Sequence, residues 1–580
     1  MAKFRIPRSL GLPFTRTAEE TYQSFTASGR ALFLFFAGVC VVSSVGLVYL
    51  LNASILVPSP ARGGSLTEGI LGSPRFINPI LAQSDADRDV TALTYSGLLR
   101  ATSEGGYEPN LAESYQISED GLSYTFVLRE DATFHDGTAV SADDVVFTIE
   151  KIQDAGLKSP LRANWDGVVV EVVDARTVRF TLKAAYAPFI KNLSLGIVPK
   201  HLWEGVSDEE FPFSDLNANP VGSGPYRVSA IERTASGIPS SYELKPFAHY
   251  VGGAPYLSLT LKFYQSEDTL VQALQDGEVD AASGISPEKL ASLNGPTIAT
   301  TPLNRVFGVF FNQNQSELLR DKAVRRALNV SVDRNELIQK VLGGYGTPLT
   351  GPVPPSVLPS GTSTLETSVE VAREILANDG WALNEQGVLT KTTGKGTSAT
   401  TATLSFDLST ANVPELRAAA EYLKGTWGQL GVQVNVKIFE AGDLSQNVIR
   451  PRRFDALLFG EVIGRELDLF AFWHSSQRND PGLNIAGYAN AAADDVLQSL
   501  RQTADTAKRQ SLYQEFSDEL KADVPAVFLY TPDFVYSIPN DIQGLDLGLV
   551  ESPSDRFLSV AQWHREVDYV WPIFARRENK

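Results

Sequence analysis

The chain has 580 residues, of which 43% are hydrophobic, and a formal net charge of −18. This length and composition are typical of a globular body with room for two or more lobes, and they exclude a disordered or fibrous chain. Residues 1–62 hold six basic and two acidic side chains, so the remaining residues carry −22, which disfavours nucleic acid and anionic lipid surfaces as partners.

The single cysteine, Cys40, limits the covalent chemistry of the chain. One cysteine excludes an intramolecular disulfide and a thiolate metal cluster. The stability of the body must therefore come from its core.

Residues 31–51 form an uncharged apolar segment that is long enough to cross a bilayer core of about 30 Å as a helix. The basic leader at residues 1–30 predicts a cytoplasmic N-terminus, because positive charge is retained on the inner side. We therefore expect a single-pass membrane anchor with the C-terminal body extracytoplasmic, at the cell surface or in the periplasm.

Two alternatives to an uncleaved anchor fit the segment less well. Cys40 lies in the middle of the apolar run and follows Val39, where a lipidated cysteine usually follows a small residue. The residues Leu51, Asn52 and Ala53 match a signal-peptidase site poorly. Residues 52–65, with two prolines and a glycine pair, are predicted to be a linker.

The sequence of residues 107–152 predicts a strand, a turn and a capped helix. Residues 122–128 alternate as a half-buried strand, and Asp136 with Gly137 supplies a tight turn. Ser141 is placed to cap a helix, with Asp144 three residues later as its capping-box partner. These signals predict an ordered α/β segment and name no function.

Two further segments precede the middle of the chain. Residues 168–173 and 177–182 alternate around a short turn and predict a β-hairpin. Residues 220–226 (PVGSGPY) superficially resemble a phosphate-binding loop, but no Lys-Ser/Thr pair follows and Pro225 blocks a helix start. We interpret this segment as a structural turn.

The second half of the chain alternates strands and helices. Residues 306–312 predict a strand that is followed by helices over 318–329 and 333–342, with Arg325 and Arg326 on the flanks as solvated or ion-paired charges. Residues 401–407, 414–430 and 432–439 predict strand, helix and strand, hence a parallel pair with a right-handed crossover. Residues 454–459 predict another buried strand.

Residues 525–532 form an apolar run that is predicted to carry the chain back to the first lobe. Together with the strand near Phe307, the run near Tyr530 gives two crossings between lobes. Two lobes joined by two strands permit hinge closure around a ligand.

The sequence contains no recognisable catalytic or metal-binding constellation. Its five histidines are scattered, and there is no H-E-x-x-H, no G-x-S-x-G and no cysteine outside the apolar segment. We therefore expect no catalytic residue, no metal and no cofactor, and we expect that the chain is not an enzyme. An extracellular enzyme, whose catalytic carboxylates come together only on folding, is kept as an alternative.

The amino-acid sequence of residues 107–152 resembles the N-terminal signature of the family 5 extracellular solute-binding proteins, the oligopeptide and dipeptide receptors of ABC importers. Residues 220–226 and 321–334 resemble the same family. The resemblance implies an α/β, two-lobed, periplasmic-binding-protein-like fold of type II, here preceded by one transmembrane helix. It implies a first lobe at residues 66–306 with an extra subdomain at about 108–215, a second lobe at 307–530, and a return to the first lobe at 531–580.

The resemblance also places a ligand loop at residues 460–468. Peptide receptors of the family have Gly-Trp-x-x-Asp there, whereas this chain has Gly460, Glu461 and Gly464 at the corresponding positions. We expect Glu466 or Asp468 to replace the missing aspartate as the anion, although both also fit as solvated loop charges. The first lobe is expected to contribute residues 75–85, and aromatic residues after the loop are candidates for the cleft, with core packing as their alternative role. The candidate ligand-binding residues are Gln83, Ser84, Asp85, Phe307, Gly460, Glu461, Gly464, Arg465, Glu466, Asp468, Trp473 and Tyr488.

The function that follows is a membrane-anchored extracellular substrate-binding protein of an ABC-type importer. Its partners are a peptide or other small solute, ABC permease subunits and the membrane, through one N-terminal helix. A modified peptide, an oligosaccharide or a cationic molecule stays open as the solute. The first rival interpretation is a membrane-tethered ligand sensor or scaffold with the same fold and no role in transport.

Overall fold

The computed structural model describes residues 21, 24–293, 297–355, 357–358, 367–394, 399–503 and 505–573. The chain forms two compact units, one of residues 1–61 with 566–580 and one of residues 62–565. Each unit is described on its own.

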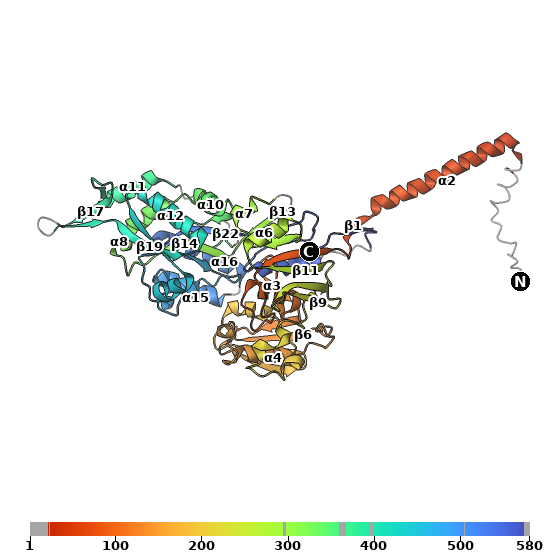
Figure 1. The fold of residues 1–580 in the computed structure, drawn as a ribbon, viewed down its shortest axis with the longest axis horizontal. Coiled ribbons are helices and arrows are strands. Elements are labelled where there is room, and N and C mark those ends of the chain that lie inside the picture. Colours follow the sequence, from red (N-terminus) through yellow and green to blue (C-terminus); the bar gives the residue numbers. More distant parts are fainter. Residues whose placement is uncertain are drawn as a thin grey trace. The chain divides into compact units, whose positions relative to one another are not determined.

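The first unit contains one long helix and a two-stranded sheet. The helix α2 (Ala27–Ile55; Figure 1) is capped by Thr26. It is apolar on all sides, and none of its residues is buried. It is the one helix in the described part of the chain that is long and apolar enough to span a bilayer, and it extends four residues beyond each end of the predicted segment 31–51. Strand β1 (Val57–Pro60) pairs antiparallel with β23 (Val567–Val570), so part of the segment expected as a linker is a strand.

The second unit is organised by a twelve-stranded mixed sheet. Its central strand, β22 (Ala526–Ile538), pairs through its first part with β14 (Arg305–Phe311) and through its last part with β13 (Thr297–Pro302) and β12 (Ala281–Ser283). The short strand β15 (Gly346–Pro348) also pairs with β22. Two chain segments, residues 302–305 and 530–533, therefore connect two halves of one sheet.

One half of the sheet belongs to the first lobe. Its strands are β2 (Ser65–Leu71), β9 (Tyr226–Arg233), β10 (Pro239–Pro246), β11 (Ser258–Tyr264) and β12. Its hydrophobic core combines residues up to Leu303 with residues from Phe534 onward. The helices and single turns of helix of this lobe are α3 (Asp85–Thr94), α4 (Ala142–Gln153), η1 (Arg162–Trp165), η2 (Ala187–Ser194), α5 (Lys200–Trp203), η3 (Phe211–Phe213), η4 (Asp215–Asn217), α6 (Glu267–Gln275), α7 (Pro287–Leu290) and η8 (Pro553–Gln562).

A separate four-stranded antiparallel sheet lies within the first lobe. Its order is β5 (Ala112–Ile117), β6 (Ser123–Leu128), β8 (Thr177–Thr181) and β7 (Val169–Asp174), and a short pair, β3 (Leu99–Ala101) with β4 (Tyr107–Pro109), precedes it. The predicted hairpin β7–β8 is confirmed. The predicted cap of α4 is confirmed too, because Asp144 accepts hydrogen bonds from both the backbone N–H (2.8 Å) and the hydroxyl (2.6 Å) of Ser141.

The other half of the sheet forms the second lobe. Its strands β19 (Ser405–Ala411) and β20 (Gln433–Phe439) are parallel and joined by α12 (Pro414–Gly428), as predicted, and β21 (Ala456–Val462) lies between β19 and β14. The remaining elements of this lobe are α8 (Glu317–Arg320), α9 (Lys322–Val330), α10 (Arg334–Leu342), α11 (Val369–Asn378), β16 (Ala382–Leu383), β17 (Leu389–Thr393), β18 (Thr400–Thr403), α13 (Ala441–Asp443), η6 (Leu444–Ile449), α14 (Phe470–Trp473), η7 (Ser475–Gln477), α15 (Ala491–Gln502) and α16 (Thr506–Asp523).

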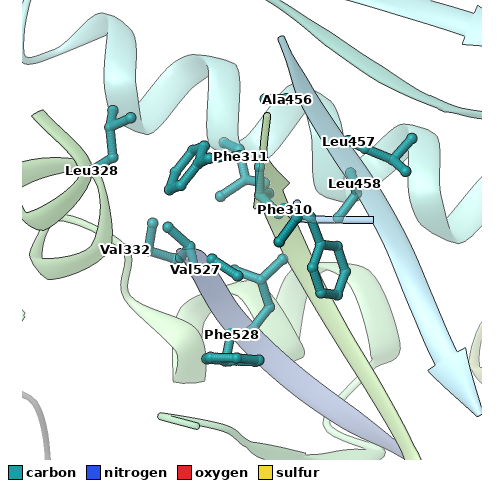
Figure 2. Close-up of a cluster of buried hydrophobic side chains, with 14 of the residues drawn as sticks. Phe310, Phe311, Leu328, Val332, Ala456, Leu457, Leu458, Val527 and Phe528 are labelled. Carbon is teal, nitrogen blue, oxygen red and sulfur yellow. The ribbon is translucent and has the colours of Figure 1, made fainter. Parts of the chain in front are cut away.

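The core of the second lobe fills both faces of this half-sheet. Figure 2 shows Phe310 and Phe311 on opposite sides of β14, since successive side chains of a strand alternate. Both rings are fully buried. The first lobe has its own core, so each lobe is held together by a separate set of apolar contacts.

Two sequence predictions in the second lobe are wrong in detail. The helix expected over 318–329 is interrupted at Asp321, whose carboxylate accepts the N–H of Ala323 at 2.9 Å and so starts α9 as a new helix. Arg325 is neither solvated nor ion-paired through a short contact. It is only 5% exposed and donates to the carbonyl oxygens of residues 319, 320, 523 and 524, which ties α9 to the end of α16.

Candidate functional site

The loop that follows β21 leaves the second lobe and reaches residues of the first lobe. It begins at Gly464, whose φ of +73° lies in the left-handed region that favours glycine. A Cβ at this position would lie 3.0 Å from Oε1 of Glu551, and the Gly464 carbonyl accepts a hydrogen bond from Nδ2 of Asn304 at 3.1 Å. Any larger side chain at position 464 is therefore strained and crowded.

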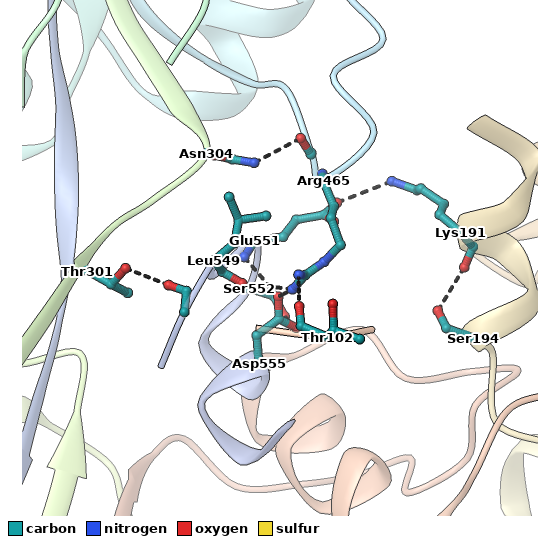
Figure 3. Close-up of polar contacts among 12 residues, drawn as sticks. Thr102, Lys191, Ser194, Thr301, Asn304, Arg465, Leu549, Glu551, Ser552 and Asp555 are labelled. Atoms are coloured by element: carbon teal, nitrogen blue, oxygen red, sulfur yellow. Dashed lines mark hydrogen bonds and ion pairs between the residues drawn. The ribbon is translucent and has the colours of Figure 1, made fainter. Parts of the chain in front are cut away.

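Arg465 joins the second lobe to the first. Its side chain is 2% exposed and donates to the carbonyl oxygens of Thr102 (2.7 Å) and Leu549 (2.8 Å) and to Oδ2 of Asp555 (2.9 Å) (Figure 3). Its backbone N–H donates to Oε2 of Glu551 at 3.1 Å. Burial raises the pKa of Asp555, while the Arg465 guanidinium opposes this shift.

Asp468 already has a cationic partner. Its two carboxylate oxygens accept hydrogen bonds from Nε (2.8 Å) and Nη2 (2.5 Å) of Arg501, and the Tyr186 hydroxyl of the first lobe donates to Oδ2 at 3.2 Å. The Arg501 guanidinium also lies 3.8 Å from the centre of the Phe470 ring. The negative charge of Asp468 is therefore compensated within the protein.

Glu466 lies between these two anchored residues and is half-buried. Burial raises the pKa of its carboxyl group, and the positive charges of Arg509 and Lys191 oppose the shift. Its backbone carbonyl accepts Nη2 of Arg509 at 2.8 Å, whereas no described residue donates a hydrogen bond to its carboxylate. Of the two acidic residues predicted to be anions for a ligand, Glu466 is the one without a short ion pair.

Glu461 is the most isolated acidic residue of the site. It is 3% exposed, and neither carboxylate oxygen has a hydrogen-bond partner among the described residues. It lies opposite Val306 in the β14–β21 pairing, and burial raises the pKa of its carboxyl group well above the ordinary value. These surroundings favour the protonated, neutral form.

An aromatic pair lies at the boundary between the lobes. The rings of Phe307 and Tyr530 are stacked with centres 5.1 Å apart, and the Tyr530 hydroxyl donates to Oε1 of Glu415 at 2.8 Å. Gly460 lies opposite Phe307, where a Cβ would come within 2.6 Å of the ring. Sequence reasoning missed Glu415, because nothing in the first turn of α12 indicates that it meets a strand more than one hundred residues later.

The first-lobe candidates form a helix start. Ser84 caps α3 in a capping box with Asp87, and Asp85 forms an exposed ion pair with Arg88 at 3.0 Å. Gln83 is exposed, and its backbone N–H donates to the Asp87 carboxylate at 3.2 Å. The contact of Gln83, Ser84 and Asp85 with a ligand stays a prediction.

The two later aromatic candidates lie in the core of the second lobe. Trp473 is fully buried, with its ring centre 6.0 Å from that of Phe310 and 5.7 Å from that of Phe528. Tyr488 is 5% exposed, and its hydroxyl donates to Oδ2 of Asp523 at 2.9 Å. The structure thus places both rings among core contacts, and their role at a ligand stays a prediction.

A cavity of about 360 Å³ lies within the first lobe, lined by α3, β3 and η8. Asp555, the partner of Arg465, forms part of its wall. Two further lining groups, the hydroxyls of Thr91 and Tyr95, are buried without a hydrogen-bond partner in the described part of the chain. A second, much smaller pocket of about 10 Å³ is lined in part by residues 466–470. Within the described ranges, no group of three His, Cys, Asp or Glu side chains is placed to hold a metal ion.

Residues 106–481 match the family model described as bacterial extracellular solute-binding proteins, family 5 middle. Among curated proteins, the oligopeptide-binding protein AppA of Bacillus subtilis is 28% identical over 510 residues, which covers 84% of this chain and 89% of that protein.

Solved structures agree with this match. The ABC transporter substrate-binding protein CtaP of Listeria monocytogenes has a TM-score of 0.71 at 27% identity, covering 87% of this chain and all of the other. The Bacillus subtilis AppA structure, solved with a nonapeptide, has a TM-score of 0.63 at 26% identity and covers 87% and 99% of the two chains. These structures have the two-lobed, type II arrangement that the sequence predicted.

Proposed function

The chain belongs to the bacterial extracellular solute-binding proteins of family 5, and from this premise we propose that it is the membrane-anchored receptor of an ABC importer. In this proposal the body is extracytoplasmic and binds a peptide or peptide-like solute between its two lobes. The nonapeptide bound by the related AppA supports this class of solute.

The connection between the lobes is the observation that carries this proposal. Residues 302–305 and 530–533 are the two crossings between half-sheets that have separate cores. A rotation about two short segments leaves both cores intact, so the lobes can move relative to each other without unfolding. The proposed lobes are residues 66–306 with 531–565, and residues 307–530. The return segment was expected to reach residue 580, but residues 566–580 belong to the other compact unit.

The chemistry of the ligand loop supports a solute that carries an amine. Gly464 replaces the family's aspartate, and Asp468 is paired with Arg501. Glu466 is half-buried at the lobe boundary and has no hydrogen-bond donor among the residues described, so we assign it as the counter-ion of a ligand ammonium. A charge-assisted hydrogen bond of this kind contributes about 1.5–3 kcal/mol.

A binding experiment on the full chain in phosphatidylcholine nanodiscs tests the assignment. A pool of random tetrapeptides should bind saturably, and Glu466→Gln should weaken binding by about tenfold or more, since about 1.4 kcal/mol corresponds to a factor of ten. The matched control is Glu515→Gln, an exposed carboxylate on α16, which should leave the affinity unchanged.

Binding of the same pool with acetylated N-termini shows whether the charge of the peptide N-terminus or the shape of the peptide determines the affinity. Acetylation should weaken binding to the wild type but have little further effect on Glu466→Gln, because the pair is already broken in that variant. No saturable binding of either pool would contradict a peptide receptor, and equal affinities of wild type and Glu466→Gln would contradict the assignment of Glu466.

The helix α2 supports the anchor. It has 29 residues and no buried side chain, its residues 31–51 carry no charge, and basic residues precede it. Intact-mass measurement of protein extracted from alkaline-washed membranes should give a mass that includes residues 31–51. A mature chain that begins near Ser54 would contradict the uncleaved anchor.

A further inference from the structure

The sheet that follows the membrane helix joins the two ends of the body. Strand β1 starts at Val57, two residues after the last residue of α2, and pairs along its whole length with β23 near the C-terminus. Because two residues span at most about 7 Å, Val57 lies close to the end of the helix. Val570 pairs with Val57 across the two strands, so Val570 also lies close to the end of the helix.

The direction of pairing determines where the chain goes after β23. The strands are antiparallel, with Val57 opposite Val570 and Pro60 opposite Val567. Since β1 runs away from the helix end, β23 runs back toward it. The residues that follow Val570 therefore continue in the direction of the bilayer that α2 would span.

These last described residues carry exposed apolar side chains. Tyr569 is 69% exposed, Trp571 is 47% exposed and Ile573 is 80% exposed. Tryptophan and tyrosine favour the headgroup layer of a membrane, where the ring is partly apolar and its polar group remains hydrated.

The length of α2 agrees with this placement. The uncharged segment 31–51 fills the hydrocarbon core, and the four helical residues after Leu51 add about 6 Å, comparable to the thickness of the interfacial layer on one side of a bilayer. The sheet β1–β23 then begins at the outer surface of the headgroups. Side chains that extend from this sheet toward the bilayer would reach the interfacial layer.

We propose that residues 569–573 form a second membrane contact, in which Tyr569, Trp571 and Ile573 enter the interfacial layer of the outer leaflet beside the anchor helix. The proposal rests on the proposed anchor and goes beyond it, because it assigns the C-terminus a surface that binds lipid. Apolar burial drives the contact, not charge, since the nearest ionic group of the strand, Asp568, is acidic.

Spin labels on the full chain in phosphatidylcholine nanodiscs test this contact. In a Cys40→Ser background, a nitroxide at Ile573→Cys should be more accessible to oxygen, which concentrates in lipid, than to a water-soluble nickel chelate. A nitroxide at Phe213→Cys is the matched control, because Phe213 is 86% exposed and belongs to the other compact unit; it should favour the nickel chelate. A third label at Val48→Cys, inside α2, reports the anchor itself.

The three labels distinguish the possible results. Lipid accessibility at positions 48 and 573 supports the proposal. Lipid accessibility at position 48 with water accessibility at 573 overturns the second contact and leaves the anchor intact. Water accessibility at both positions overturns the anchor, and with it the contact that depends on the anchor.

Discussion

Arg465 of the second lobe and Asp555 of the first lobe form an ion pair at 2.9 Å in which the arginine side chain is 2% exposed. The same guanidinium donates to two carbonyl oxygens of the first lobe. Nη1 and Nη2 both donate to acceptors in the opposite lobe, so these hydrogen bonds require the lobes to be together. In the proposed receptor, Arg465 would therefore link residues 460–468 to the closed state.

Replacing Arg465 by alanine should destabilise the closed arrangement. Removing one partner of a buried pair costs about 3–5 kcal/mol, because the remaining carboxylate keeps its burial without compensation. Hydrogen–deuterium exchange should then accelerate at residues 99–102 and 549–552. Arg179→Ala, which removes an exposed ion pair with Glu171, is the control and should change exchange little. Equal exchange in wild type and Arg465→Ala would contradict the role of this contact.

The carboxyl group of Glu461 should make stability depend on pH. Its folded-state pKa is raised well above the ordinary 4.5, so between these two values the folded chain holds a proton that the unfolded chain has released. The free energy of unfolding therefore falls as pH rises through this window, by at most about 1.4 kcal/mol per pH unit.

Glu461→Gln removes this proton and should flatten the dependence. Chemical unfolding between about pH 5 and pH 8 should show a smaller loss of stability in Glu461→Gln than in the wild type, whereas Glu515→Gln should follow the wild type. Parallel curves for wild type and Glu461→Gln would show that Glu461 is ionised in the folded state.

Adding a methyl group at Gly460 should disturb the aromatic pair. A Cβ there would lie 2.6 Å from the Phe307 ring, which is stacked on Tyr530, so the ring must move. We expect Gly460→Ala to weaken binding of the tetrapeptide pool by several-fold. Gly425→Ala, on α12 with open space around the new carbon, should leave binding unchanged and raise stability by about 1 kcal/mol at most. Unchanged binding in Gly460→Ala would place the aromatic pair outside the ligand site.

The first lobe depends on a buried charge network. Arg556 donates to Glu68 at 2.7 Å and to Asp89 at 2.7 and 2.9 Å, and all three residues are at most 2% exposed. Arg556→Met leaves two buried carboxylates without a cation, so calorimetry should show a loss of about 3–5 kcal/mol for this lobe. The control is Arg88→Met on α3, which removes an exposed ion pair and should shift the transition little. Equal transitions for the two variants would contradict the role of Arg556.

Local signals in the sequence predicted much of the fold. The spacing of Ser141 and Asp144 predicted the capping box, and the strand–helix–strand pattern before Phe439 predicted the parallel pair β19–β20. The apolar runs near Phe307 and Tyr530 predicted two strands that the structure pairs directly with each other. Such features depend on neighbouring residues or on periodicity, which a sequence records.

Properties that depend on distant residues were not predictable. Asp468 and Arg501 are 33 positions apart, and only the fold shows that they neutralise each other. Arg325 was expected at the surface because it is charged, yet four carbonyl oxygens from two helix ends surround it. In the same way, the burial of Glu461 without a hydrogen-bond partner among the described residues depends on the fold, which the sequence does not show.

The distance between the ends of the large sheet tests closure around a solute most directly. Nitroxides at Ala235→Cys, in the β9–β10 turn, and Lys437→Cys, on β20, report on the first and second lobes in a Cys40→Ser background of the full chain in nanodiscs. We predict that double electron–electron resonance gives a broad distance distribution without solute and a narrower, shifted one when the tetrapeptide pool is saturating, because a ligand that contacts both lobes favours the closed state. Identical distributions with and without bound peptide would contradict a hinged solute receptor.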